Sequence, residues 1–335
     1  MNNIGKSSLV FENIYIKETA TVVGPKEHNG PYGEFFDKYY NDLFAGGEQS
    51  FEKAEMKMFN DALQIVMKKA KISENCINCI FSGDLNNQII IGNYVLRNYD
   101  IPYIGIFGAC STSILGIITG CLYLNGIKGN VISMTSSHNA TAERQFRYPN
   151  EYGGQKANTA TLTVTGASAT LLTNVEKTEI KVTKATIGKV IDPLIKDSQD
   201  MGRAMAPAAY STIIDHLENF KETIDDYDLI ITGDLSHYGS EMLIKLFKED
   251  NIDISNKYID SGNYIFDKEK QEVLAGGSGC ACLGVFLNGY ILKLMKEKQI
   301  KKILVVGTGA LLNTVIVSQK ETIPGIAHAV VIEVE

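Results

Sequence analysis

The residue types best suited to covalent chemistry stand at positions 108–113, which read GACSTS. This stretch follows an apolar, strand-like run and precedes an uncharged, helix-like run, so Cys110 is predicted to lie on a sharp turn between a strand and a helix. The hydroxyls of Ser111, Thr112 and Ser113 are expected to cap that helix. Its positive N-terminal end lowers a thiol pKa and attracts anions. Three alternatives follow: a thiolate nucleophile, a site for a ligand carboxylate, or a small buried cysteine.

The most polar segment of the chain, TSSHNATAERQFRYP, covers residues 135–149 and follows the next predicted strand. Arg144 and Arg147 are three residues apart, so on a helix they converge on one side. Arginine forks bind carboxylates in a bidentate manner. The alternative is that both arginines pair with Glu143 and Glu151 in a structural network.

Hydroxyl and imidazole groups precede these arginines in the same segment. Ser136 and Ser137 end the predicted strand, and His138 comes directly after it. Ligands of parallel α/β sheets bind beyond the carboxyl ends of strands, where Cys110 is also expected. The segment therefore predicts a pocket for a small dianion next to Cys110.

Composition limits the classes of function. The chain has 335 residues, 44% of them hydrophobic, and a formal net charge of −7. Its mild acidity argues against nucleic-acid binding, which requires a basic surface. Cys76 and Cys79 form a C-x-x-C pair without a second pair at matching spacing, so no metal site is predicted. The N-terminus lacks the apolar stretch of a signal peptide, and we expect a cytoplasmic, soluble protein.

Two long uncharged stretches, residues 101–127 and 273–292, have a composition that also occurs in membrane spans. Each contains a glycine-rich turn, so both are predicted to be helices buried inside a large soluble core.

The chain also repeats itself, and the repeat predicts the fold. CIFSGDL at 79–85 resembles LIITGDL at 229–235, and the turn and uncharged helix at 108–126 resemble those at 276–292. Strand-like and helix-like runs alternate throughout, which is typical of an α/β fold with largely parallel sheets. We therefore predict two pseudo-symmetric halves, residues 1–178 and 179–335, with the uncharged helices side by side between them.

The segments VGPKEHNGPYGEFFD, GACSTS, SSHNATAERQFRYPNEYGGQ, MGRAMAPAA, AGGSGCAC and IPGIAHAV, with others between residues 10 and 330, closely resemble the stage V sporulation protein AD family. That resemblance implies a thiolase-like α/β fold of layered α-β-α-β-α architecture, with two buried central helices. It also implies binding of dipicolinic acid (pyridine-2,6-dicarboxylate), free or as its calcium chelate, during uptake into the developing spore.

The same resemblance bears on catalysis. Thiolase-like condensing enzymes use a cysteine at the position of Cys110, together with a histidine and an asparagine from the second half. Here Gly233 or Asp234 stands where the histidine is expected, and Gly277 stands where the asparagine is expected. We therefore predict a non-enzymatic binding protein without catalytic residues. The alternative is a thiolase-like acyl-transfer or condensing enzyme that uses Cys110 on coenzyme A thioesters.

The resemblance and the residue pattern together give the remaining expectations. No cofactor is expected, and calcium enters only as the dipicolinate chelate. Expected partners are integral membrane proteins of the same spore uptake system and a second copy of the chain in a homodimer, with a location peripheral to the spore inner membrane. The candidate ligand-binding residues are Cys110, Ser136, Ser137, His138, Arg144, Arg147 and Asn313.

Overall fold

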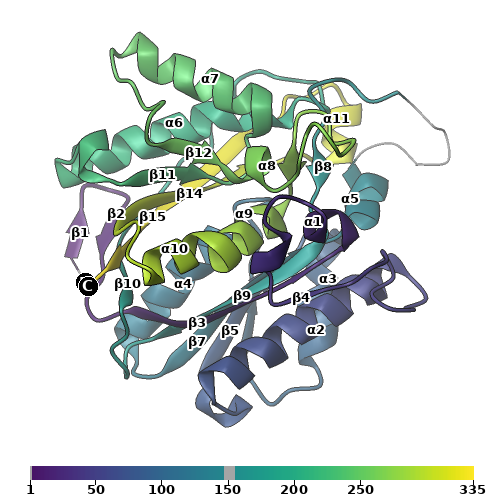
Figure 1. Cartoon of the computed structure of the whole chain (residues 1–335). Helices are drawn as coiled ribbons and strands as arrows, with labels where there is room; N and C mark the ends of the chain where they lie inside the picture. The colour runs from purple at the N-terminus through teal and green to yellow at the C-terminus, as the bar shows by residue number, and fades with distance from the viewer. Residues whose placement is uncertain (1, 147–154) are drawn as a thin grey trace.

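The computed structural model describes residues 2–146 and 155–335, whose strands assemble into one large central sheet (Figure 1). Along the sheet the order is β12-β11-β14-β15-β10-β3-β9-β7-β5-β6. The bounds, in that order, are Tyr258–Asp260, Leu229–Thr232, Lys302–Ala310, Gly325–Val334, Ile180–Ile187, Tyr15–Val23, Gly166–Thr173, Asn130–Ser137, Cys79–Gly83 and Tyr103–Gly105. The short strands β1 (Asn2–Ile4), β2 (Ser8–Val10) and β4 (Lys38–Tyr39) pair at its margins, and β8 (Leu162–Thr163) pairs with β13 (Gly277–Ser278).

The strand order is the same in the two halves of the sheet. Outward from the centre the first half runs β3-β9-β7-β5-β6, and the second half runs β10-β15-β14-β11-β12. If the five strands of each half are numbered along the chain, both halves show the spatial order first, fifth, fourth, second, third. The halves meet where β3 and β10 pair in antiparallel fashion. The strand order therefore repeats in two halves, as a pseudo-symmetric fold requires, and residue 178 lies in the connection between β9 and β10.

Helices form three layers: one on the outer face of each half of the sheet, and one between the two halves (Figure 1). On the outer face of the first half lie α2 (Phe51–Ala70) and α3 (Ile90–Leu96), and on that of the second half lie α6 (Met201–Phe220) and α7 (Ser236–Glu249). Between the halves pack α4 (Thr112–Gly126) and the continuous run of α9 (Cys280–Phe286), a π-helical turn (Leu287–Ile291) and α10 (Leu292–Lys296). Shorter helices are α1 (Pro25–His28), α5 (Asn139–Phe146), α8 (Ser261–Tyr264) and α11 (Thr314–Ser318).

The middle layer confirms the prediction of two buried central helices. Ile114, Ile117 and Cys121 of α4 share one apolar cluster with Phe286 and Ile291 of the second central helix. In the described part of the chain, only Ala109–Gly126 is long and apolar enough to cross a membrane, and 61% of it is buried within the fold. The uncharged composition of this helix therefore reflects its place between the two halves of the sheet, where most of its side chains are buried.

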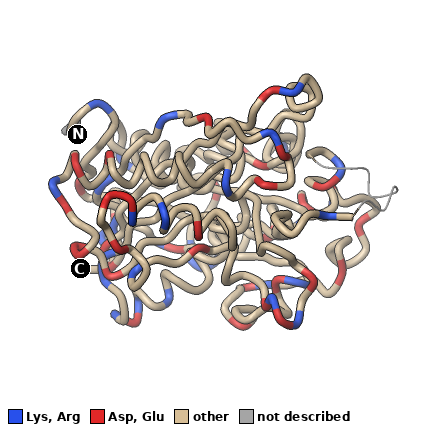
Figure 2. Tube along the Cα trace, turned by 90° about the horizontal axis from the view of Figure 1, so that it is seen from above, with Lys and Arg blue, Asp and Glu red and all other residues tan. Residues whose placement is uncertain are grey.

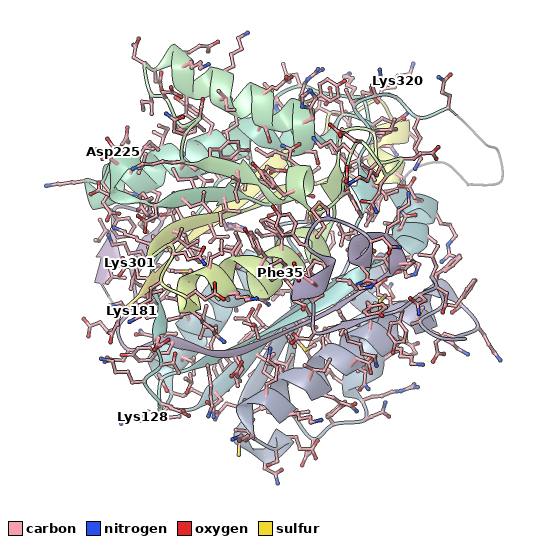
Figure 3. The ribbon with its side chains drawn as sticks, viewed as in Figure 1. Phe35, Lys128, Lys181, Asp225, Lys301 and Lys320 are labelled. Carbon is pink, nitrogen blue, oxygen red and sulfur yellow. The ribbon has the colours of Figure 1, made fainter. Side chains whose placement is uncertain are left out.

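Positions of basic and acidic residues are interspersed along the chain trace (Figure 2). Lys128, Lys181 and Lys301 project from one end of the sheet, and Lys320 projects at the opposite end beside α11 (Figure 3). The two chain ends lie at the same side of the molecule (Figure 2).

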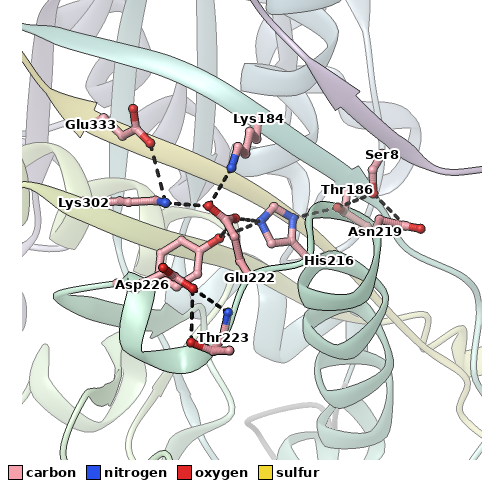
Figure 4. Close-up of polar contacts among 11 residues, drawn as sticks. Ser8, Lys184, Thr186, His216, Asn219, Glu222, Thr223, Asp226, Lys302 and Glu333 are labelled. Atoms are coloured by element: carbon pink, nitrogen blue, oxygen red, sulfur yellow. Dashed lines mark hydrogen bonds and ion pairs between the residues drawn. The ribbon is translucent and has the colours of Figure 1, made fainter. Parts of the chain in front are cut away.

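A polar network centred on Glu222 links strands and a helix of the second half (Figure 4). Glu222 accepts hydrogen bonds from Lys184 and Lys302, each at 2.6 Å, and from the Tyr227 hydroxyl, also at 2.6 Å. Burial alone would raise the pKa of Glu222, but these three donors lower it to about 2. Tyr227 in turn lies 3.0 Å from Nε2 of buried His216. The network therefore joins β10, β14 and the end of α6 through one ionised carboxylate.

We expect Glu222→Gln to lower the free energy of unfolding at pH 7 by about 2 kcal/mol, because three hydrogen bonds lose their charged acceptor. A carboxyl with a depressed folded-state pKa stabilises the fold above its unfolded pKa and loses this effect in acid. The difference between variant and wild type should therefore shrink as pH falls from 4.5 toward 2. Urea unfolding across that range measures it, and a difference independent of pH would contradict the assignment.

Candidate functional site

The turn that carries Cys110 has a strained, tightly bonded backbone. Ala109, directly before the cysteine, has a φ of 51°, in the left-handed region that residues with a side chain seldom adopt. The Ser111 hydroxyl donates to the Gly108 carbonyl at 2.6 Å, and the Thr112 hydroxyl donates to the Ala109 carbonyl at 2.6 Å. The prediction that these hydroxyls cap α4 is therefore wrong: they donate to turn carbonyls and leave the helix N–H groups free of side-chain caps.

The Cys110 thiol faces a carboxyl group from the other half of the chain. Cys110 is 8% exposed, and Asp234, which follows β11, is 1% exposed. Burial raises the pKa of the Cys110 thiol well above its ordinary value, and the charge and hydrogen bond of Asp234 raise it further. A thiol that donates to a carboxylate is held protonated. This is the opposite of the activation that a histidine or a lone helix N-terminus gives.

Asp234 is fixed in place by two donors from its own half of the chain. Its Oδ1 accepts from the Thr308 hydroxyl at 2.8 Å, and its Oδ2 accepts from the Gly279 backbone N–H at 3.0 Å. Burial raises the pKa of Asp234 to about 6, against the effect of these donors and of Cys110. Gly279 has a φ of +99°, and a Cβ there would lie 2.9 Å from Thr163 and 3.0 Å from Ser137, so only glycine suits the position.

A small cavity of about 30 Å³ opens beside Cys110. At that size it accommodates one or two water molecules. Most of its described walls are apolar, and Thr163 and Ser278 add hydroxyl groups. The lining residues are Leu85, Phe107, Ala109, Cys110, Ala142, Phe146, Thr163, Met201, Ser278, Gly279, Ala310 and Leu312.

Three helices begin at this cavity. Cys110 stands two residues before α4, Met201 is the first residue of α6, and Gly279 directly precedes α9. Each helix N-terminus carries free N–H groups and a partial positive charge. Their convergence adds a partial positive potential to the cavity, which the nearby Asp234 carboxyl opposes at the Cys110 sulfur, and the described lining contains no cationic side chain.

Ser136, Ser137 and His138 are close to Cys110 in sequence, but they do not line its cavity. The Ser136 hydroxyl donates to buried Glu55 at 2.8 Å, and the Ser137 hydroxyl donates to the Val164 carbonyl at 2.7 Å. His138 is fully buried, and its Nε2 donates to the Leu43 carbonyl at 2.8 Å. Burial lowers the pKa of His138, so its imidazole is neutral at pH 7. All three side chains are engaged in holding the fold around the site.

The remaining predicted residues stand at its periphery. Arg144 on α5 is more than half exposed and forms an ion pair with Glu52 of α2, so its predicted structural partner Glu143 is not the one it contacts. Asn313 caps α11 by accepting from two backbone N–H groups. Arg147, the other predicted arginine, lies outside the described residues, as does Glu151.

The repeated GDL is the one sequence signal for Asp234, whose contact with Cys110 we did not predict. Asp84 and Asp234 stand in the repeated GDL, a pattern that favours structural caps at strand ends over metal ligands. Asp84 does accept backbone hydrogen bonds from Asn86 and Ile91, at 2.8 and 3.0 Å. Asp234 departs from this pattern because it also contacts the Cys110 thiol.

Metal binding has no visible basis in residues 2–146 and 155–335. All six cysteines are free thiols, and Cys76 is exposed whereas Cys79 is buried. No group of three or more His, Cys, Asp or Glu side chains is arranged to hold a metal ion within these ranges.

Comparison with known proteins gives a match over nearly the whole chain. The pattern of the family described as stage V sporulation protein AD (SpoVAD) matches residues 5–333. Stage V sporulation protein AD of Bacillus subtilis (strain 168) is 45% identical over 335 residues, which cover 99% of this chain and 98% of that protein.

Solved structures share the fold at low sequence identity. A variant of Xanthomonas campestris OleA has a TM-score of 0.60 at 13% identity, covering 97% of this chain and 99% of that chain. The 3-oxoacyl-[acyl-carrier-protein] synthase III of Aquifex aeolicus VF5 has a TM-score of 0.55 at 13% identity, covering 96% and 99%. These likenesses confirm the thiolase-like fold and carry no conclusion about activity.

We expect Asp234→Asn to lower the pKa of the Cys110 thiol, because the substitution removes the negative charge beside the sulfur. The measurement is the pH dependence of iodoacetamide alkylation at Cys110, located by peptide mass spectrometry. Half-maximal alkylation should move to lower pH in the variant. Asp260→Asn is the matched control, because Asp260 is equally buried and is not among the groups that perturb Cys110. An unchanged profile in Asp234→Asn would show that the carboxylate does not control the thiol.

Proposed function

The chain belongs to the stage V sporulation protein AD family, and from this premise we propose that it serves sporulation as a non-enzymatic binding protein for dipicolinic acid. The ligand is taken up as the free dicarboxylate or as its calcium chelate, in support of its transfer into the developing spore. Calcium arrives with the ligand in this proposal, and the protein supplies no metal site of its own.

The observation that carries the proposal is the convergence of three helix N-termini on the Cys110 cavity. An anion placed there lies at the N-terminal ends of α4, α6 and α9, whose partial positive charges attract it. The apolar walls suit the flat face of an aromatic ring, and Thr163 and Ser278 offer hydroxyl donors. Entry of a pyridine ring requires side chains at the walls to move, because the cavity of about 30 Å³ is smaller than the ligand.

Two arginines on the helices that border the cavity, outside its described lining, are the candidates for the second carboxylate. Arg144 is two residues before Phe146, and Arg203 is two residues after Met201, where Phe146 and Met201 both line the cavity. Arg203 is bonded to Asp200 at 3.0 Å and lies over the Tyr238 ring, so it is positioned but half-exposed. A ligand carboxylate that exchanges with Glu52 or Asp200 can take up either guanidinium.

The Cys110–Asp234 contact supports a binding role over a catalytic one. Acyl transfer needs a thiolate, and the neighbouring carboxylate raises the thiol pKa instead. Condensation further needs donors for the developing oxyanion, whose loss costs orders of magnitude in rate. Among the described residues, the groups next to the thiol are the Asp234 carboxyl and the Gly279 backbone. His138 bonds the Leu43 carbonyl instead, and His328 accepts from the Gly188 backbone N–H.

One observation favours the alternative, a condensing or acyl-transfer enzyme that acts on coenzyme A thioesters. The Cys110 turn keeps the strained geometry of a nucleophile elbow, with Ala109 in the left-handed region. Incubation with acetyl-coenzyme A followed by intact-protein mass spectrometry separates the two. Our proposal predicts no adduct, and a stable adduct on Cys110 that is absent from Cys110→Ser would establish the alternative.

We also propose a homodimer and integral membrane partners from the same uptake system, which place the protein at the spore inner membrane. The dimer has a candidate surface at β6, whose outer edge is unpaired within the described sheet. Ile104 and Phe107 are about half exposed there, at 45% and 52%. An exposed apolar edge strand favours pairing with another chain. Sedimentation equilibrium of wild type and Ile104→Lys tests this surface, and a monomeric wild type would exclude it.

Isothermal calorimetry with dipicolinate tests the proposed function. We expect saturable binding to wild type, and binding at least tenfold weaker in Arg144→Ala, because a charge-assisted hydrogen bond contributes about 1.5–3 kcal/mol. Ala142→Leu should weaken binding without a change of charge, since it fills the wall of the cavity. Arg97→Ala is the matched control, because Arg97 is an exposed arginine that stacks on Tyr94 away from the cavity. The absence of binding to folded wild type would refute the proposal.

A further inference from the structure

A second cavity lies behind the strand segment that borders the Cys110 cavity. It has a volume of about 230 Å³ and is lined by Pro25, Lys26, Glu27, Leu43, Asn139, Leu162 and Thr165. Thr163 lines the first cavity, whereas Leu162 and Thr165 line the second, so residues 162–165 separate the two. The two cavities share no lining residue.

Glu27 leaves a hydrogen-bonding oxygen unused in the wall of this cavity. The residue is 2% exposed, and its Oε1 accepts from the Thr165 backbone N–H at 2.8 Å. Its Oε2 is buried and has no hydrogen-bond partner among residues 2–146 and 155–335. A buried carboxyl oxygen without a donor is costly, and native proteins seldom leave one without reason. Burial raises the pKa of Glu27 to about 7, so a donor that binds here stabilises the ionised form.

Asn139 supplies the complementary group. Its backbone N–H donates to the Thr165 hydroxyl at 3.0 Å, which fixes the start of α5 against the segment 162–165. Its side-chain Nδ2 is buried and has no acceptor. The wall therefore contains one unpaired acceptor and one unpaired donor, on residues that both contact Thr165.

The rim of the cavity adds a cation and an apolar surface. Lys26 is exposed, and its Nζ donates to the Glu272 backbone carbonyl at 3.3 Å. Pro25, Leu43 and Leu162 provide apolar contacts. Lys26 and Leu162 also line an adjoining open groove, which gives the cavity a route to solvent.

We propose that this second cavity binds a small zwitterion of the amino-acid type. The ligand ammonium group donates to Glu27 Oε2, and the ligand carboxylate accepts from Asn139 Nδ2 and Lys26. A short apolar side chain packs against Leu43 and Leu162. This inference goes beyond dipicolinate binding, because the ligand carries a positive group and occupies a different cavity.

The choice of ligand follows from matching charges. A dicarboxylate would bring a second negative charge to Glu27, and a simple amine would leave Asn139 without an acceptor. A carboxylate alone would leave Glu27 unpaired. A molecule with a donor at one end and an acceptor at the other can satisfy both buried groups.

The test uses L-valine as the probe and calorimetry on the full chain as the readout. Wild type should bind L-valine saturably, whereas isobutylamine and isobutyrate, which each carry half of its polar groups, should bind at least tenfold more weakly. Glu27→Gln should weaken L-valine binding at least tenfold, because it keeps the acceptor for Thr165 and removes the charge. Lys26→Met, at an exposed position, tests the carboxylate end without risk to the core.

Glu269→Gln is the matched control, since it removes an exposed carboxylate from the adjoining groove, outside the cavity. It should leave L-valine binding within twofold of wild type. Dipicolinate binding should be the same in Glu27→Gln and wild type, which keeps this proposal separable from the proposed function. The inference is overturned if folded wild type does not bind L-valine, if Glu27→Gln and Lys26→Met bind it as wild type does, or if Glu27→Gln weakens dipicolinate binding instead.

Discussion

The contact between the Cys110 thiol and the Asp234 carboxyl is the interaction on which the site depends. One group comes from each half of the chain, and both are almost fully buried. Asp234 is held within its own half, by Thr308 and by Gly279 at the start of the second central helix. The contact with Cys110 therefore forms only where this half packs against the turn of the first half. The contact sets the protonation of the thiol and therefore decides whether this turn acts as a nucleophile or as part of a binding surface.

Pseudo-symmetry explains why the site lies where it does. Each half repeats one strand order, with parallel strands β5, β6 and β7 in the first half and β11, β12 and β14 in the second. The carboxyl ends of both sets of parallel strands therefore lie toward the same site. The central helices α4 and α9 begin at that end, and α6 begins there as well. A duplicated fold thus brings several helix N-termini to one cavity, a field that suits an anionic ligand without any cationic side chain in the described lining.

The fold could be predicted from the sequence because its signals are local and repeated. The GDL pair, the two uncharged helices and the alternation of elements each follow from periodicity and hydropathy. The residues of the site were harder to predict from the sequence. Adjacent residues of a strand point to opposite faces, so Ser136 and Ser137 end on different partners, Glu55 and the Val164 carbonyl. The role of Asp234 depends on packing between the halves, which no local pattern encodes.

Alkylation of wild-type Cys110 by iodoacetamide at pH 7, with and without dipicolinate, tests the central claim most directly. The account predicts slow alkylation of a protonated thiol, and further protection that saturates with dipicolinate as the ligand occupies the cavity. Fast alkylation at pH 7, or a rate that saturating dipicolinate leaves unchanged, would contradict it.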